Sequence, residues 1–491
     1  MNVRLAALVA ELDDPHVTGD LGVTIRAVAH DSRTVAPGTL FVALRGERVD
    51  GHAFVAAALA AGATGAVVDR EFDVATLAAR ADGATIVVVR DTRRALSRLA
   101  AVFFGRPSES MRVTGVTGTN GKTTVTHLAA AMLDAGGIAT GRIGTLGARF
   151  GGAMWSLENT TPLALELQSL LAEMRDRGAR AVAMEASSHA LAQDRVADVA
   201  FAVAALTNVT RDHLDYHGTF EAYAAAKRSL FDHAPVAIIN GDDDLGRVWA
   251  SELRAAGKTV DTYALDADAT LVAREIAVRA DGSSFNVDGR RFALRLPGRF
   301  NISNALAALG IARTHGVADD DSARAMAAFE RVPGRMEHLS GGGIDVLVDY
   351  AHTPDALDVV LRAARETTRG ELAVVFGCGG DRDRGKRPLM GAIARTRADR
   401  VFVTSDNPRS EDPQEIIDEI LAGMDDLREV IALVDRRAAI RRAILDAEPG
   451  DVVVVAGKGH ETYQIIGTVS NHFDDRDEVR AALAAREPGS A

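Results

Sequence analysis

At 491 residues the chain is too long for one ordinary hydrophobic core, so about three domains are expected. A net charge of −12 and an aromatic share of 5% argue against a nucleic-acid partner, which calls for basic and stacking side chains. The single cysteine, Cys378, excludes an internal disulfide framework and fits a reducing compartment. The N-terminus does not have the sequence pattern of a signal peptide. No apolar run approaches the ~20 residues of a membrane span, so we expect a cytoplasmic protein.

Residues 1–104 hold short strand-like runs and Ala-rich helical segments, which are typical of a small α/β binding domain. Two polar islands, 30–33 and 46–52, interrupt these runs, and composition alone favours ordinary turns for both. A stretch rich in Pro, Gly and Ser around 104–110 indicates a linker to the next domain.

The segment 114–124 reads Thr-Gly-Val-Thr-Gly-Thr-Asn-Gly-Lys-Thr-Thr and joins a strand-like run to a helical pattern that Gly136-Gly137 should end. Where a strand becomes a helix, free N–H groups and glycine backbone can surround a phosphate. Lys122 would reach the terminal phosphates and Thr123 would hold Mg²⁺. The strict phosphate-loop motif has glycine where this chain has Val116, so a Gly-rich structural turn is the alternative to nucleotide binding.

Between 105 and 333, apolar runs at 181–184, 201–206 and 236–239 alternate with helical patterns, which predicts a mostly parallel sheet. Ligands of such sheets lie beyond the carboxyl ends of the strands, and polar residues follow each of these runs.

Three side chains of this segment are candidates for chemistry. Glu185, directly after a strand, is a possible metal ligand, and a carboxylate favoured by a helix dipole is the alternative. His213 lies in a very polar cluster, where a metal or phosphate contact competes with a structural role. Lys227, from spacing alone, is interpreted as a solvated helix lysine.

After a second break at 331–337, a new alternation of apolar runs and helical patterns predicts a third, doubly wound domain. The apolar runs are 345–348, 372–376, 401–404 and 452–456. Each is followed by a polar loop, and the four loops are 350–355, 377–387, 405–410 and 457–462. We expect them to meet in one site at the sheet edge, although Gly-rich connectors that solvate the edge are the alternative. The glycines at 377–380 do not complete a dinucleotide fingerprint, so a nicotinamide cofactor is not expected.

Five motifs spread over the chain resemble those of the Mur ligases. They are Thr-Gly-Thr-Asn-Gly-Lys-Thr-Thr (117–124), Met-Glu-Ala-Ser-Ser-His-Ala-Leu (184–191), Asn-Val-Thr-Arg-Asp-His-Leu-Asp-Tyr-His-Gly (208–218), Pro-Gly-Arg-Phe-Asn-Ile-Ser-Asn-Ala (297–305) and Asp-Tyr-Ala-His-Thr-Pro (349–354). This family has a shortened phosphate loop, which accounts for Val116. Within the family, the tetrapeptide Asp406-Asn407-Pro408-Arg409 accompanies meso-diaminopimelate rather than L-lysine as the added amino acid.

The resemblance implies an α/β fold of three domains and an amide ligation in peptidoglycan synthesis. The expected domains are 1–104, which binds a UDP-sugar, 105–333, a central ATPase-like domain with a mostly parallel sheet, and 334–491, a Rossmann-like domain that binds the amino acid. In the implied reaction, ATP activates the γ-carboxylate of UDP-N-acetylmuramoyl-L-alanyl-D-glutamate as an acyl phosphate, and the amine of meso-diaminopimelate then displaces phosphate. A monomer is expected.

The family's functional positions carry over motif by motif. ATP would be bound by Gly118, Thr119, Asn120, Gly121, Lys122, Thr123, Thr124, Asn304, Arg335 and Asp349. Catalytic roles would fall to Lys122, Glu185, His213 and Lys227, and Mg²⁺ would be held by Thr123, Glu185, His213 and a carbamylated Lys227. The UDP-linked dipeptide would contact Ser32, Glu47, Arg48, Val49, Asn159, Thr160, Thr161, Ser187, Gln193 and Arg195. Diaminopimelate would contact Arg382, Asp406, Asn407, Pro408, Arg409, Gly457 and Glu461.

Two other functions fit parts of the pattern. A folylpolyglutamate synthase, or the next ligase of the same pathway, would share the phosphate chemistry, but the 406–409 tetrapeptide argues against both. A nucleotide-switched binding protein would hydrolyse ATP without ligating anything, and it would release phosphate whether or not an amino acid is present.

Overall fold

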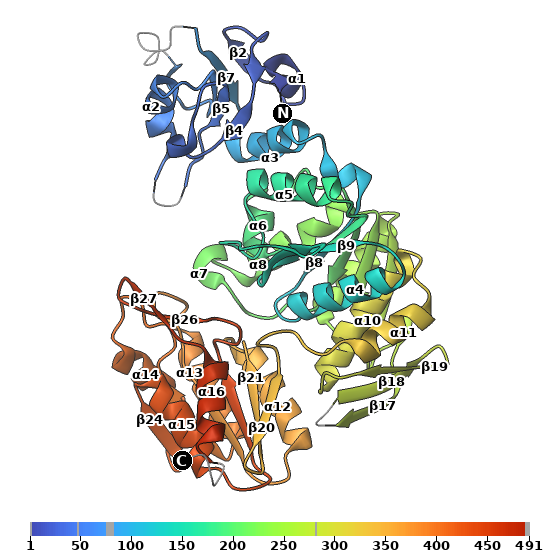
Figure 1. The fold of residues 1–491 in the computed structure, drawn as a ribbon, viewed down its shortest axis with the longest axis vertical. Helices are drawn as coiled ribbons and strands as arrows, with labels where there is room; N and C mark the ends of the chain where they lie inside the picture. The colour runs from blue at the N-terminus through green and yellow to red at the C-terminus, as the bar shows by residue number, and fades with distance from the viewer. Residues whose placement is uncertain (1, 47–48, 75–82, 280–281, 487–491) are drawn as a thin grey trace. The chain divides into compact units, whose positions relative to one another are not determined.

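The computed structural model describes residues 2–46, 49–74, 83–279 and 282–486 (Figure 1). The chain forms two compact units. The first consists of Met1–Thr117, Gly137–Ala205 and Ala226–Ala237, and the second of Gly118–Gly136, Leu206–Ala225 and Ile238–Ala491. The domain boundaries expected at 104 and 333 stay predictions. No helix among the described residues is both long and apolar enough to cross a membrane.

The N-terminal part of the first unit is a five-stranded sheet with the order β2-β7-β6-β5-β4. Its strands are β2 (His16–Thr18), β4 (Ala27–Ala29), β5 (Thr39–Val42), β6 (Gly65–Asp69) and β7 (Thr85–Val89), and only β2 runs antiparallel to its neighbour. A two-stranded sheet, β1 (Val3–Arg4) with β3 (Thr24–Ile25), and the helices α1 (Leu5–Val9), α2 (Val55–Ala60) and α3 (Thr92–Phe103) complete this part. Successive residues of β5 enter opposite cores, because Leu40 packs with α3 and Phe41 with α2.

A second sheet of the first unit carries the strand that leads into the phosphate loop. Its order over this unit is β11-β10-β9-β12-β8-β13. The strands are β8 (Arg112–Thr117), β9 (Thr140–Gly144), β10 (Gly147–Phe150), β11 (Ala153–Trp155), β12 (Ala181–Glu185) and β13 (Phe201–Leu206), with helices α5 (Ala164–Asp176) and α6 (Ser188–Ala192). β12 is parallel to both β8 and β9, as predicted, whereas β10 and β11 add an antiparallel edge that was not predicted.

In the second unit, α4 (Lys122–Ala135) packs against α10 (Arg299–Thr314) and α11 (Asp319–Ala328), and the three helices lie side by side in Figure 1. α4 ends before Gly136-Gly137, as predicted. The other elements of this region are α7 (Leu214–His217), α9 (Asp244–Ala255), β15 (Thr259–Ala264) and β16 (Leu271–Val272). Two further elements, α8 (Phe220–Arg228) and β14 (Val236–Asn240), contribute residues to both units. A three-stranded antiparallel sheet follows, formed by β17 (Arg274–Arg279), β18 (Gly282–Val287) and β19 (Arg290–Leu294).

The C-terminal region of the second unit is a doubly wound sheet with the order β20-β21-β25-β22-β23-β24. Its strands are β20 (Glu337–Gly341), β21 (Ile344–Asp349), β22 (Leu372–Phe376), β23 (Arg400–Thr404), β24 (Val430–Leu433) and β25 (Val452–Ala456). Its helices are α12 (Pro354–Thr367), α13 (Lys386–Arg397), α14 (Pro413–Leu421), α15 (Arg436–Asp446) and α16 (Asp475–Ala484), and the hairpin β26 (Tyr463–Ile466) with β27 (Val469–His472) precedes α16. All pairs except β20–β21 are parallel, which confirms the predicted Rossmann-like architecture.

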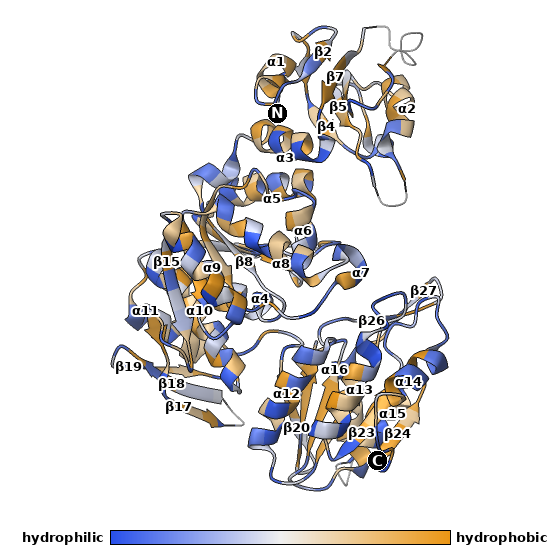
Figure 2. Ribbon diagram, turned by 180° about the vertical axis from the view of Figure 1, so that it is seen from behind, coloured by the Kyte–Doolittle hydropathy of each residue, from blue (hydrophilic) through white to orange (hydrophobic). Residues whose placement is uncertain are grey.

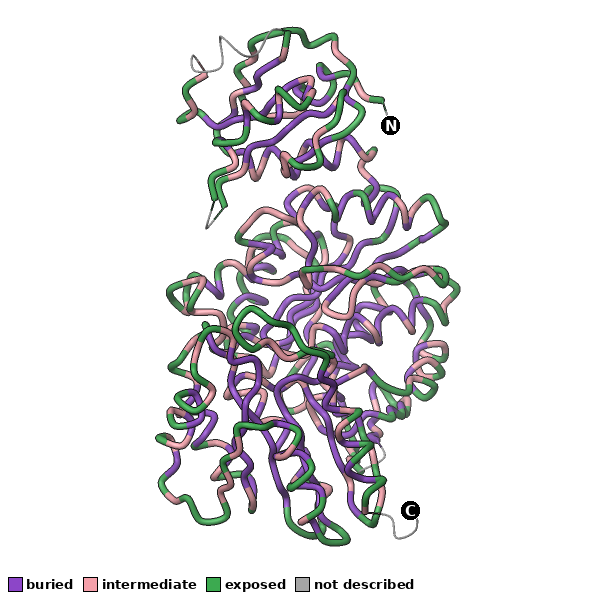
Figure 3. Tube along the Cα trace, turned by 60° about the vertical axis from the view of Figure 1, so that its left-hand side comes forward, coloured by how far each residue is buried: buried purple, intermediate pink, exposed green. Residues whose placement is uncertain are grey.

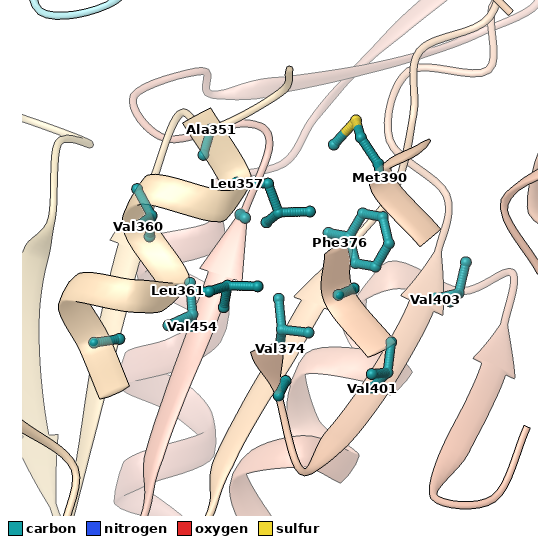
Figure 4. Close-up of a cluster of buried hydrophobic side chains, with 14 of the residues drawn as sticks. Ala351, Leu357, Val360, Leu361, Val374, Phe376, Met390, Val401, Val403 and Val454 are labelled. Carbon is teal, nitrogen blue, oxygen red and sulfur yellow. The ribbon is translucent and has the colours of Figure 1, made fainter. Parts of the chain in front are cut away.

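Both faces of this sheet are covered. Val374 and Phe376 of β22 pack with α12, α13 and α14 (Figure 4). Val375 of the same strand packs with α15 and α16 on the other face. Figure 2 accordingly shows hydrophobic (orange) strands between helices that are hydrophilic in part, and Figure 3 shows the strands buried (purple). The strands therefore read as continuous apolar runs rather than as alternating ones.

One fully buried ion pair joins α15 to α16. Arg436 Nη2 lies 2.7 Å from Asp475 Oδ2, both side chains are 0% exposed, and Arg436 also donates to the carbonyl of Ala456 at 2.9 Å. Desolvation makes such a pair a weak net stabiliser, but breaking it leaves one charge buried and unpaired.

We expect Arg436→Met to lower the free energy of unfolding by roughly 3–5 kcal/mol, because the Asp475 carboxyl group is then buried without the partner it has in the wild type. The double variant Arg436→Met/Asp475→Leu should lose less than the sum of the single losses. Urea denaturation followed by circular dichroism measures both. Arg442→Met on the same helix, which removes an exposed ion pair with Asp446, is the control and should change little. A loss below about 1 kcal/mol for Arg436→Met would contradict the argument.

Candidate active site

The phosphate loop, residues 118–121, follows β8 in the chain and precedes α4. Gly118 and Gly121 have φ angles of 145° and 89°, which favour glycine. Two N–H groups of the loop are held by Asn208: Thr119 N donates to its carbonyl at 2.8 Å and Asn120 N to its Oδ1 at 2.9 Å. Lys122 Nζ donates to the carbonyls of Gly118 and Thr119, both at 2.8 Å, so its ammonium lies over the loop. The loop thus has the shape expected of a phosphate cradle.

The departure from the strict motif has a structural explanation. Val116 is fully buried inside β8, so the position where the motif has glycine belongs to the strand and not to the loop. At the other end, a Cβ on Gly121 would stand 2.3 Å from Asn304 Oδ1. Close packing against α10 therefore demands glycine at 121 but not at 116.

A cavity of about 300 Å³ opens beside the loop. It is lined by Asn120, Gly121, Thr123 and Thr124 of the loop and first turn, by Asn304, Arg335 and Asp349, and by apolar side chains that include Leu265, Phe300, Val359 and Val360. The three residues predicted to bind nucleotide outside the loop are thus brought together here. A half-apolar cavity next to a phosphate cradle suits a nucleoside whose base is buried and whose phosphates are held by backbone.

Arg335 and Asp349 are fixed by their neighbours. The Arg335 guanidinium lies 4.6 Å from the centre of the Tyr350 ring and donates to Thr123 Oγ1 at 3.3 Å. Asp349 accepts from the N–H groups of Met336 at 2.7 Å and Ala351 at 2.8 Å. Burial raises the pKa of Asp349, while Arg335 opposes that effect.

A network that the sequence did not reveal links the loop to α12. Asp355 Oδ2 accepts from Asn120 Nδ2 at 3.1 Å and from Thr210 Oγ1 at 3.3 Å. Thr119 Oγ1 in turn lies 2.9 Å from the hydroxyl of Tyr223. The side chains of the loop are therefore held from elements far away in sequence.

A second cavity, of about 330 Å³, brings together the polar ends of β21, β22, β23 and β25 with the segment 211–215. The predicted residues that line it are His213, Arg382, Asp406, Asn407, Arg409, Gly457 and Glu461. Pro408 is not among the lining residues, and its carbonyl accepts from Glu411 N at 3.1 Å. The convergence of four polar loops at one sheet edge is thus present as predicted.

Cationic groups surround one carboxylate at this edge. Burial acts to raise the pKa of Asp212, but the charges of His213, His352 and Lys386 outweigh it, so the pKa is lowered. Lys386, the first residue of α13, donates to the carbonyl of His352 at 2.9 Å. Asp212, His352 and Lys386 also line the cavity, although none of them was selected from the sequence as a candidate.

Arg409 has a left-handed backbone, with φ of 53°, which is uncommon for a residue other than glycine. The conformation is supported by the β26–β27 hairpin, because Arg409 N donates to the carbonyl of Ile465 at 3.1 Å and Gly467 N donates to the carbonyl of Arg409 at 2.7 Å. Its guanidinium donates to the carbonyl of Gly380 at 2.7 Å. His213, with φ of 53°, is a second such residue at the cavity.

The first unit holds a separate polar cluster at the end of β12. Glu185 is 1% exposed, and its carboxylate accepts from the N–H and hydroxyl of Thr145 at 2.9 and 3.1 Å. Thr161 Oγ1 donates to the carbonyl of Glu185 at 2.8 Å, and Ser187 N donates to Thr161 Oγ1 at 3.1 Å. Ser187, not Glu185, caps α6 by accepting from Ala190 N, so a helix dipole does not explain Glu185.

Other predicted substrate contacts lie in the same unit. Thr160 Oγ1 lies 3.2 Å from Thr145 Oγ1, and Arg195 donates to the carbonyl of Thr161 at 2.9 Å and to Gln193 Oε1 at 3.0 Å. Asn159 is half-buried. Thr145, which binds Glu185 through two atoms, was missed because nothing in its local sequence marks it.

Two of the four substrate contacts predicted in the N-terminal part, Ser32 and Val49, lie within the described residues. Ser32 begins a short 3₁₀ turn in which Asp31 accepts a hydrogen bond from Arg33 N at 2.9 Å. In the second polar island, Asp50 accepts from His52 N at 3.0 Å. Both islands therefore contain turns, as composition predicted. Val49 is exposed. Glu47 and Arg48 lie outside the described residues.

The interpretation of Lys227 as a solvated lysine is wrong. Its side chain is only 2% exposed, because it shares the inner face of α8 with the fully buried Tyr223, one helical turn earlier. Lys227 and Glu185 belong to the first unit, and Thr123 and His213 to the second. Among the described residues, no group of three or more His, Cys, Asp or Glu side chains is placed to hold a metal ion.

Comparison with known proteins gives three family matches. The model for the Mur ligase family, catalytic domain, matches residues 24–104, that for the Mur ligase middle domain matches 116–312, and that for the Mur ligase, glutamate ligase domain, matches 334–459. Together they cover most of the chain.

Curated relatives match over nearly their whole length. A UDP-N-acetylmuramoyl-L-alanyl-D-glutamate–2,6-diaminopimelate ligase of Thermosynechococcus vestitus is 46% identical over 496 residues, which covers 99% of this chain and 98% of that protein. The protein of the same name from Pseudomonas syringae pv. tomato is 46% identical over 480 residues, with 94% and 96% covered.

Solved structures agree. A structure described as UDP-N-acetylmuramoyl-L-alanyl-D-glutamate–2,6-diaminopimelate ligase has a TM-score of 0.70 and 34% identity and covers 99% of both chains. A Mycobacterium tuberculosis folylpolyglutamate synthase complexed with ADP and AMPPCP has a TM-score of 0.61 at 21% identity, covering 74% of this chain and 92% of that one. The second likeness concerns the fold alone.

The packing of Gly121 against Asn304 predicts that Gly121→Ala weakens nucleotide binding at least about tenfold, because the added methyl group must displace Asn304 or distort the loop. Calorimetric titration with a non-hydrolysable ATP analogue measures the effect. Gly137→Ala is the matched control: Gly137 also has a positive φ, of 78°, but nothing lies within 4 Å of its added Cβ. Equal loss of affinity in both variants would show that general backbone strain, and not the site, is responsible.

Proposed function

Because this chain belongs to the Mur ligase family, whose models match it from 24 to 459, we propose that it joins meso-diaminopimelate to UDP-N-acetylmuramoyl-L-alanyl-D-glutamate with consumption of ATP. Membership of the family makes the chain an ATP-dependent ligase. The choice of substrates rests on the relatives' names and on the second cavity.

The observation that carries the proposal is the charge pattern of the second cavity. The charged side chains that line it include the guanidinium groups of Arg382 and Arg409 and the carboxylate of Glu461. Diaminopimelate offers two carboxylates for the arginines and a distal ammonium for Glu461. L-Lysine lacks the distal carboxylate and would leave Arg409 unmatched, so the site favours diaminopimelate.

The first cavity supports ATP as the source of activation. A carboxylate is a poor acyl donor at neutral pH, so it must first gain a leaving group. We propose that the γ-carboxylate of the D-glutamyl residue attacks the γ-phosphorus of ATP and forms an acyl phosphate, while the bond from that phosphorus to the bridging oxygen breaks and ADP leaves. Lys122 and the N–H groups at the start of α4 offset the charge of the phosphates, while Asn304, Arg335 and Asp349 hold the nucleoside.

In the second step the amine of diaminopimelate attacks the acyl carbon, and phosphate leaves with the electron pair of the broken carbon–oxygen bond. The protein contributes by holding the amine and the acyl phosphate close together. His213 and Asp212 line the second cavity and are close in sequence to the Asn208 that shapes the phosphate loop. This linkage supports one continuous site for both steps.

The proposed Mg²⁺ ligands are Thr123, Glu185, His213 and a carbamylated Lys227. Their chemistry fits the ion: among the described residues the Glu185 carboxylate accepts hydrogen bonds from Thr145 alone, which leaves carboxylate lone pairs for a cation, and a carbamate would add an anionic oxygen. When bound, Mg²⁺ would neutralise phosphate charge. Lys227 is only 2% exposed, and a buried charged group requires a partner, which Mg²⁺ would supply to a carbamate.

We assign the UDP-linked dipeptide to the first unit. The cluster of Thr160, Thr161, Ser187, Gln193 and Arg195 offers hydroxyl, amide and guanidinium groups to a peptide carboxylate and its amides. Ser32, Val49 and Asn159 are proposed as further contacts, as are Glu47 and Arg48. A cytoplasmic location, a monomeric state and the three domain boundaries remain predictions from the sequence.

The proposal is tested by phosphate release from ATP with Mg²⁺ and the UDP-linked dipeptide, with meso-diaminopimelate, with L-lysine or with neither. We expect release that depends on diaminopimelate, and an amide product of matching amount by mass spectrometry. Equal phosphate release with neither amino acid present would identify an ATP hydrolase and refute the ligase. Preference for L-lysine would refute the proposed amino acid alone.

Lys227→Ala should lose nearly all turnover, and short carboxylates such as acetate should restore part of it by supplying the missing anionic oxygen. Initial rates with and without added acetate measure this. Arg228→Ala, at the next position of α8, is the control and should show no acetate-dependent gain. An active Lys227→Ala variant, or an inactive one that no carboxylate rescues, would contradict the carbamate.

A further inference from the structure

Lys458 is a fully buried cation directly behind the second cavity. It follows β25, its side chain is 0% exposed, and it is not among the residues that line the cavity. Burying an ammonium is costly unless it is paired and hydrogen-bonded. Its position therefore needs an explanation beyond packing.

The partners of Lys458 are side chains of the amino-acid site itself. Its Nζ lies 3.1 Å from Asn407 Oδ1, 3.3 Å from Glu461 Oε2 and 3.8 Å from Asp406 Oδ1. These three residues line the cavity on the other side. Lys458 thus touches the acidic part of the site from the protein interior.

The same contacts orient Asn407 and Glu461. An ammonium can only donate, so it draws Asn407 Oδ1, which also accepts from Ile465 N at 2.9 Å. The Asn407 Nδ2 group is then directed to Glu461 Oε2, at 3.0 Å. With Oε2 bound to protein groups, the Oε1 side of Glu461, whose nearest partner is the Tyr350 hydroxyl at 3.5 Å, is left for a ligand.

The charges also decide what the site attracts. Two carboxylates, Asp406 and Glu461, lie near each other, and burial and Asp406 raise the pKa of Glu461 while Lys458 acts to lower it. Other groups that face Glu461 are Tyr350 from the end of β21, Tyr463 from β26 and the buried Arg436 of α15, which is already paired with Asp475. Lys458 lies within 4 Å of both carboxylates. Unlike Arg436, it is not paired with a third carboxylate among the described residues.

We infer that Lys458 is a positioning residue that sets the amino-acid preference of the site: it cancels one of the two carboxylate charges and aims Glu461 at the ligand. The net charge around Asp406 and Glu461 is then suited to one ammonium group with a carboxylate beside it, as at the far end of diaminopimelate. Without Lys458, the excess negative charge would favour a ligand whose far end is an ammonium alone. This inference rests on the proposed function.

The test compares kcat/KM for meso-diaminopimelate and L-lysine in wild type and Lys458→Met. We expect the preference for diaminopimelate to fall at least about tenfold, mainly through KM for diaminopimelate, with KM for ATP unchanged. Lys458→Gln, which keeps a hydrogen-bond donor but not the charge, should show the same fall and serves if Lys458→Met does not fold. Asp406→Asn added to Lys458→Met should restore part of the preference, because it removes the excess negative charge.

The pH dependence gives a second readout. Loss of the neighbouring cation raises the pKa of Glu461, so Glu461 ionises only at higher pH, and KM for diaminopimelate in Lys458→Met should rise more at about pH 6 than at about pH 8. Gln464→Ala is the neutral control. It removes a hydrogen bond of 2.8 Å to the carbonyl of Asp406 but no charge, so it should leave both the preference and the pH profile unchanged.

The outcomes separate the two claims. If wild type shows no turnover that depends on diaminopimelate, the proposed function fails. If wild type is active and both Lys458 variants raise KM for the two amino acids by the same factor with an unchanged pH profile, Lys458 only supports the fold and the inference is overturned.

Discussion

The phosphate loop depends on Asn208, which holds the N–H groups of Thr119 and Asn120 through its carbonyl and its side chain. The loop has two glycines with positive φ, so hydrogen bonds from outside it help to fix its shape. Asn208 begins the polar segment that continues through Asp212 and His213 into the second cavity. One short segment thereby joins the groups proposed to hold the nucleotide to those proposed to face the amino acid.

The fold could be predicted from the sequence wherever strands are buried on both faces. The apolar runs 201–206, 372–376 and 452–456 coincide with β13, β22 and β25, because a strand covered on both sides must be apolar at every position. The elements that were missed, such as the β17–β19 sheet and the β26–β27 hairpin, alternate or are exposed. Their local sequence resembles that of polar loops, and their pairing arises from contacts that sequence alone does not specify.

The candidate site divides in a similar way. Residues of compact motifs, such as Asn304 and Arg409, were found because several of their neighbours in sequence belong to the same motif. Thr145, Asp355 and Lys458 were not selected, although Asp355 and Lys458 belong to predicted polar loops, because the part each plays depends on one side chain that meets residues distant in sequence or is buried behind the cavity. The burial of Lys227 likewise could not be predicted from the sequence, because it depends on which face of α8 packs against the protein interior.

The backbone of Arg409 bears on how such a site could change during evolution. Its left-handed conformation is stabilised by main-chain hydrogen bonds to the β26–β27 hairpin, more than fifty residues later in the chain. Replacing the 406–409 tetrapeptide by that of a relative would alter the side chains but not the hairpin that shapes them. A lineage that switches to another amino acid would therefore have to change the two segments together, and chimeras that exchange only one should be poor enzymes for either substrate.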